Sequence, residues 1–256
     1  MKPVRIGAIL ATLAGCALLT ACAGNATRGS DDTGDLGAAE LNSPGDVYVA
    51  MAAEYYRRGQ LEVALQRAQK GLDVDPRNAR AHYMIAVLYQ RIGENARAEK
   101  HFSEAARLDP KNSDIRNAWG SFYCAQKRYG EAEKQFKAAL ANPLYSTSWV
   151  AITNSGICAR QSGNSQKAEA EFRRALVANP RYGPALFELA DMSYARGDYK
   201  SARTHLSKYF ESNQPTPKSL SLAARVERKL GSRKRAATYE TMLRKTYPNS
   251  VEALAL

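Results

Sequence analysis

Residues 117–136 read NAWGSFYCAQKRYGEAEKQF, and residues 153–172 read TNSGICARQSGNSQKAEAEF. Aligned with one another, both stretches contain a glycine, a break in the apolar spacing, an alanine and a phenylalanine, in the same order and at the same spacing. The matched pairs are Gly120 with Gly156, Ala132 with Ala168, and Phe136 with Phe172. Such self-similarity indicates a chain built from repeated units.

The same positions recur along most of the chain at a constant step, with one longer step between the third and fourth members. A period of about 34 residues is the signature of the tetratricopeptide repeat (TPR), a helix–turn–helix unit. The sequence therefore predicts an all-α fold, a right-handed superhelical TPR solenoid of six helix-turn-helix repeats. The recurring positions are Ala64, Ala98, Ala132, Ala168, Ala202 and Ala236; Ala52, Ala86, Gly120, Gly156, Ala190 and Ala224; and Gly59, Gly93, Lys127, Gly163, Gly197 and Gly231.

Packing explains why these residue types recur. Small residues at one site on each helix let the two helices of a repeat approach closely, and proline ends the second helix because it cannot continue the hydrogen-bond ladder. In the last repeat, Glu227 and Glu240 stand where earlier repeats have aromatic residues, as expected for a terminal repeat that faces water. The predicted repeats are 45–78, 79–112, 113–148, 149–182, 183–216 and 217–250, followed by a C-terminal tail at 251–256.

The N-terminus carries the features of an export signal. Lys2 and Arg5 precede an uncharged, largely apolar run from Ile6 to Leu19. A membrane-spanning helix needs about 20 apolar residues, so this shorter run is typical of a cleaved secretory signal instead. We therefore predict a signal peptide at 1–21.

The LTAC motif at 19–22 resembles the lipobox of bacterial lipoproteins. This resemblance implies cleavage before Cys22 and acylation of that cysteine. Ala23 stands where a lipoprotein retained in the inner membrane would typically carry aspartate, so the resemblance favours the periplasmic face of the outer membrane. The alternative is an ordinary cysteine in a soluble exported protein. Residues 22–44 are polar and rich in Gly, Ser and Asp, which predicts a flexible tether, or alternatively a partner-binding arm.

Composition limits the classes of partner. The chain has 256 residues, of which 45% are hydrophobic and 24% charged, as in an ordinary soluble globular protein. The formal charge of +12 favours an anionic membrane, an acidic protein or nucleic acid. Because the chain is predicted to be exported, we do not expect nucleic acid to be a partner.

No catalytic motif or metal-binding motif is recognisable in the sequence. His82, His101 and His205 are scattered singly, and the sequence has no HExxH pair, CxxC cluster or Gly-rich phosphate loop. We therefore predict no enzymatic activity, no metal and no cofactor. An enzyme with an unrecognised site is the alternative, and the lack of any convergent polar cluster speaks against it.

Two cysteines remain after Cys16 leaves with the signal and Cys22 takes lipid. Cys124 and Cys158 lie in the first helices of the third and fourth repeats, which a solenoid places side by side. In an oxidising periplasm these residues form a candidate disulfide. The alternative is two buried free thiols that pack as small apolar residues.

The stacked first helices of a TPR solenoid line its concave face, where peptides usually dock. Extending the helical phase outward from the small-residue series predicts a groove with exposed apolar side chains edged by arginine. Such a groove would suit a hydrophobic peptide with acidic flanks, although each residue could instead serve in packing between repeats. The predicted groove residues are Val49, Ala53, Tyr56, Arg57, Tyr83, Val87, Arg91, Asn117, Ser121, Phe187 and Tyr194.

Two stretches resemble a known family. Residues 117–164, with the inserted NPLY…SW loop, and residues 226–250, VERKLGSRKRAATYETMLRKTYPNS, are similar to the type IV pilus biogenesis lipoprotein family (PilF/PilW/Tgl), the pilotins of the pilus secretin. The motif at the N-terminus, the tether and the repeat order agree with this resemblance. Ser221 and Ala223 depart from it, since a bulkier residue and glycine are expected there.

The resemblance implies an outer-membrane lipoprotein adaptor that is monomeric. It would bind secretin subunits through its first repeats and promote their outer-membrane targeting and multimerisation, for type IV pilus biogenesis and twitching motility. The alternative is another TPR envelope lipoprotein, one that regulates peptidoglycan synthesis or outer-membrane protein assembly.

Overall fold

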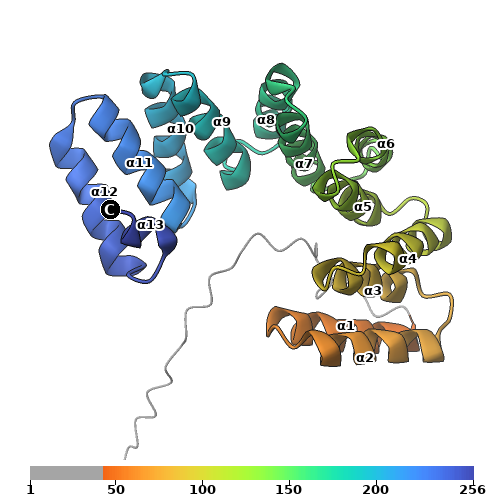
Figure 1. Ribbon diagram of the computed structural model, residues 1–256. Helices are drawn as coiled ribbons and strands as arrows, with labels where there is room; N and C mark the ends of the chain where they lie inside the picture. Colours follow the sequence, from red (N-terminus) through yellow and green to blue (C-terminus); the bar gives the residue numbers. More distant parts are fainter. Residues whose placement is uncertain (1–42) are drawn as a thin grey trace, which may run out of the picture. The chain divides into compact units, whose positions relative to one another are not determined.

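The computed structural model describes residues 43–256, and every regular element within that range is a helix (Figure 1). The predicted signal peptide, Cys22 and nearly all of the predicted tether lie outside the described residues. None of the described helices is long and apolar enough to span a membrane. The helices are α1 (Pro44–Arg57), α2 (Leu61–Val74), α3 (Ala79–Arg91), α4 (Asn95–Leu108), α5 (Ser113–Ala125), α6 (Tyr129–Leu140), α7 (Ser148–Gln161), α8 (Ser165–Ala178), α9 (Gly183–Ala195), α10 (Tyr199–Ser212), α11 (Pro217–Lys229), α12 (Arg233–Thr246) and α13 (Val251–Leu254).

The first twelve helices pack as six consecutive pairs, from α1 with α2 to α11 with α12 (Figure 1). Each first helix also contacts the first helix of the next pair. The recurring alanines, together with Gly120 and Gly156, lie where the helices pack, and Ala64, Ala98 and Ala132 are fully buried. The structure thus confirms the predicted all-α TPR fold.

The turn inside each pair uses a left-handed backbone conformation. Five of the six turn positions in the repeated series are glycine, with φ between 73° and 85°. The sixth is Lys127, with φ of 60°, in the turn between α5 and α6. Since an L side chain is disfavoured at positive φ, this one departure from the glycine series lies at a strained position.

The longer step of the third repeat falls in the connection between α6 and α7. Helix α6 has 12 residues, whereas α4 and α8 have 14, so the chain leaves the helix early and residues 141–147 form a longer loop. The Tyr145 hydroxyl donates to the Asp114 carboxylate at 2.8 Å and holds this loop on α5.

One expectation for the C-terminal end was wrong. Glu227 is 3% exposed, not water-facing, because it accepts two hydrogen bonds from Arg203, at 2.8 Å and 2.6 Å. Residues 251–256, predicted as a C-terminal tail, contain the short helix α13. Ala253 of that helix joins a small core cluster with Leu220 and Leu243, so α13 covers the end of the last pair.

Candidate binding groove

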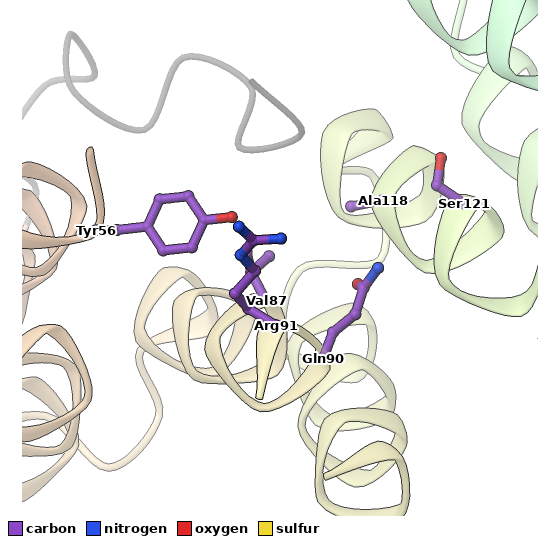
Figure 2. A pocket seen from close by; sticks show the side chains of 6 residues that line it. All are labelled: Tyr56, Val87, Gln90, Arg91, Ala118 and Ser121. Carbon is purple, nitrogen blue, oxygen red and sulfur yellow. The ribbon is translucent and has the colours of Figure 1, made fainter. Parts of the chain in front are cut away.

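A cavity of about 200 Å³ lies across the first helices of the first three repeats. Figure 2 shows the Tyr56 ring reaching from α1 toward the Arg91 side chain on α3, with Ala118 and Ser121 on the neighbouring helix α5. The walls of the cavity combine an aromatic ring, small side chains, an amide and a guanidinium group. The lining residues are Tyr56, Val87, Gln90, Arg91, Ala118 and Ser121.

Repeat symmetry explains why these residues meet. Val87 and Ser121 are one repeat period apart and so occupy the same place in successive repeats, as do Tyr56 and Gln90. On α3, Val87, Gln90 and Arg91 are spaced by three and four positions and therefore share one helix face. Packing of first helix on first helix brings that face next to its neighbours on α1 and α5.

The structure brings together four of the predicted groove residues, namely Tyr56, Val87, Arg91 and Ser121. Gln90 and Ala118 also line the cavity and were not predicted. The signal for Gln90 was present in the sequence, because it is the equivalent of Tyr56 in the next repeat.

Five predicted groove residues are buried, and three of them, Val49, Ala53 and Tyr83, do not line the cavity, so the expectation that they form an exposed apolar strip was wrong. Val49 is 0% exposed, Ala53 is 2% exposed and Tyr83 is 3% exposed, all within one core cluster. The Tyr83 ring lies 6.2 Å from the ring of Phe102, measured between centroids. Neighbouring helices cover all three side chains, because successive repeats pack closely against one another.

The predicted residues farther along the chain are also engaged within the protein. Asn117 is buried and accepts a hydrogen bond from the Asn154 amide at 3.1 Å. Phe187 and Tyr194 pack half-buried against a separate core cluster, and Arg225 lies over the Tyr194 ring, 4.4 Å from its centroid. None of these three predicted residues lines the cavity.

The arginines near the groove differ in their pairing. Arg57 and Arg58 both pair with Glu54, and their hydrogen bonds lower the pKa of that carboxyl below its ordinary value. Arg91 is exposed, and no carboxylate of the described part of the chain lies within 4.0 Å of it. The positive charge at the cavity is therefore that of Arg91, which could pair with a carboxylate of a bound peptide.

The prediction that the histidines are scattered was wrong for two of them. The Nδ1 atoms of His82 on α3 and His101 on α4 lie 3.0 Å apart. Burial lowers the pKa of both imidazoles, and burial together with the neighbouring His82 lowers that of His101 to about 4. Among residues 43–256, no group of three or more His, Cys, Asp or Glu side chains is arranged to hold a metal ion.

The structure joins Cys124 of α5 to Cys158 of α7 by a disulfide, with the two Cα atoms 5.7 Å apart. Both cysteines are buried. This separation lies within the usual range for bridged cysteines.

The family model that matches this chain is described as tetratricopeptide repeat, and it matches residues 49–113, 83–146 and 155–216. The chain is a TPR protein. It is also 30% identical over 207 residues to the type IV pilus assembly protein PilF of Pseudomonas aeruginosa, covering 81% of this chain and 82% of that protein.

Solved structures extend the comparison. The crystal structure of PilW, a widely conserved type IV pilus biogenesis factor, superposes with a TM-score of 0.72 at 30% identity and covers 84% of this chain and 98% of that one. The structure of Pseudomonas aeruginosa PilF gives a TM-score of 0.70 at 29% identity, covering 82% of this chain and 95% of that one. The chain belongs to the PilF and PilW family of type IV pilus biogenesis proteins.

Proposed function

We propose that this protein is an outer-membrane lipoprotein adaptor, a pilotin, for the secretin of the type IV pilus. In this proposal, acylated Cys22 anchors it at the periplasmic face. The repeats bind secretin subunits and promote their targeting and multimerisation without any enzymatic step. Family membership and the LTAC motif support the proposal.

The single observation that carries the binding step is the cavity across α1, α3 and α5. Its aromatic wall and the Arg91 guanidinium suit an apolar segment that ends in, or is flanked by, an acidic residue. Anchoring would confine the captured subunits to the plane of one membrane, which raises their effective concentration for ring assembly.

The binding step is tested by reversing the charge at the cavity. Arg91→Glu should weaken co-purification of the secretin and reduce its heat- and detergent-resistant oligomers on blots. The control is Arg181→Glu, at another exposed arginine outside the cavity, which should leave both unchanged. Normal rings and normal twitching in a strain deleted for the gene would overturn the pilus proposal. Altered peptidoglycan or outer-membrane proteins in that strain would favour the alternative envelope role.

The anchoring step is tested separately with Cys22→Ala. We expect the variant to lose the acyl chains seen by mass spectrometry, to fractionate as soluble periplasmic protein, and to leave the secretin mislocalised. Retention of the variant in the outer-membrane fraction without acylation would refute lipid anchoring.

A further inference from the structure

The last helix pair concentrates the positive charge of the protein. Residues 217–246, which span α11 and α12, contain nine lysine and arginine residues and two glutamates, a formal charge of +7 out of +12 for the whole chain. All nine basic residues are exposed. A charge of this density in one helix pair creates a strong local field that attracts anions.

The two acidic side chains of this pair are already engaged. Glu227 is buried against Arg203 of α10, and Glu240 pairs with Arg228 at 2.6 Å. Within the described part of the chain, no carboxylate lies within 4.0 Å of the basic groups of α12, which are those of Arg233, Lys234, Arg235, Arg244 and Lys245. The cations of this helix therefore keep their full capacity to bind an external anion.

The outer face of α12 combines these cations with uncharged side chains. Lys234, Thr238, Thr241 and Lys245 recur at spacings of three and four positions, so they lie along one line of the helix. Met242 beside that line is 40% exposed. Together they form a shallow, open hollow rather than a cleft, lined by Lys234, Ala237, Thr238, Thr241, Met242, Lys245 and Thr246.

This geometry suits a flat anionic surface better than it suits single-stranded nucleic acid or a peptide. Single-stranded nucleic acid needs exposed aromatic rings for base stacking, but Tyr239, the aromatic residue of α12, is half-buried and stacks on Phe210 with ring centroids 5.5 Å apart. A peptide would gain little from a surface that contacts it on one side only. A helix with basic residues and an exposed methionine can instead lie on the headgroups of an anionic bilayer.

We propose that the outer face of α12 docks on the anionic phospholipid headgroups of a bilayer. The choice of a bilayer rests on the proposed function, which places the chain at a membrane. The 22 residues from Cys22 to Ser43 would span at most roughly 80 Å if fully extended, which leaves an anchored chain room to turn a face of its repeats toward its own membrane.

The experiment uses the chain from residue 22 onward, without the predicted signal peptide and with Cys22→Ala so that it cannot be acylated, and vesicles made from a two-to-one mixture of phosphatidylethanolamine and phosphatidylglycerol. We expect it to co-sediment with these vesicles at low salt, but not with vesicles of phosphatidylcholine. The quadruple variant Lys234→Gln, Arg235→Gln, Arg244→Gln and Lys245→Gln should lose at least about tenfold in partitioning. The matched control carries Lys→Gln at four exposed lysines of earlier repeats, Lys100, Lys111, Lys134 and Lys137, and should lose less than about twofold.

Equal losses in the two quadruple variants would overturn the proposal, because net charge rather than α12 would then be responsible. Equal binding to both kinds of vesicle, or no binding, would also overturn it. Full competition by a low concentration of inorganic phosphate would show a site for free phosphate instead of a bilayer. Each variant is first checked by its thermal unfolding. None of these outcomes affects the acylation test of Cys22, so the two proposals fail independently.

Discussion

Replacing Gly120 by alanine probes the contact that sets the spacing between α5 and α6. A Cβ atom at Gly120 would lie 2.7 Å from Cε1 and 2.8 Å from Cδ1 of Phe136, so the ring would have to move by several tenths of an ångström. Phe136 is 2% exposed, and crowding of this kind in a packed core costs about 1–3 kcal/mol. Alanine regains about 1 kcal/mol of helix propensity. We expect Gly120→Ala to lower the free energy of unfolding by about 1 kcal/mol, the difference between these two effects.

The control is the same substitution in open space. Gly130 lies at the start of α6, and a Cβ there would meet no atom within 4 Å. Gly130→Ala should therefore raise the free energy of unfolding by up to about 1 kcal/mol. Urea titration followed by circular dichroism in the far ultraviolet measures both variants. Equal stabilisation by the two substitutions would refute the packing argument.

A second substitution tests whether the ring itself is the obstacle. The fifth repeat has Ala190 and Leu206 at the places equivalent to Gly120 and Phe136, and both are buried. Phe136→Leu should reduce the cost of Gly120→Ala, so that the double variant is more stable than the sum of the single effects by about 1 kcal/mol. Strict additivity would show that something other than the ring opposes the new methyl group.

Three further predictions concern other features of the fold. Lys127→Gly should raise the free energy of unfolding by up to about 1 kcal/mol in the same titration, because it relieves a positive φ; a loss of stability would contradict this. His82 and His101 have lowered pKa values in the folded protein, so below about pH 6.5 the unfolded chain binds more protons than the folded chain does. The free energy of unfolding should therefore fall as the pH drops from about 6.5 toward about 4. We expect a loss of about 1–2 kcal/mol after allowance for the partial exposure of both side chains. Urea midpoints at neutral pH and at about pH 5 should therefore differ less in His101→Gln than in the natural chain. Thiol titration of unfolded, unreduced protein should find Cys124 and Cys158 unreactive, and their reduction should cost roughly 3–4 kcal/mol; two titratable thiols would show that the bridge is absent.

The fold was predictable because its determinants recur at a fixed interval. Ala64, Ala98 and Ala132 report the same helix crossing three times, so chance agreement at one place matters little. The single substitution in the turn series, Lys127, did not obscure the pattern, and the structure gives it the backbone conformation of the glycines.

The groove was predictable only in part, because helical phase says where a side chain points but not how closely the next helix approaches it. Val49 and Tyr83 have the correct phase for the concave face, yet neighbouring helices cover them. Tyr56 and Arg91, nearer the ends of α1 and α3, stay accessible and line the cavity.

The histidine contact was missed for a different reason. Comparison of equivalent positions relates His101 to His205 in a distant repeat, whereas the contact of His101 is with His82 in its own helix pair. Periodicity compares one repeat with another and carries no information about which side chains meet within a pair. Nor does periodicity show which side chains meet between neighbouring pairs, as Glu227 does with Arg203 of the preceding repeat.

A stack of units that touch only their neighbours can fray from either end, one unit at a time. The covalent bond between Cys124 and Cys158 closes a ring that encloses the whole of α6 and the longest connection between the pairs. Fraying that begins at α1 or at α12 would therefore stop at a closed loop in the middle of the chain. Under a pulling force, the protein would give way in two separate stretches, one on each side of that ring.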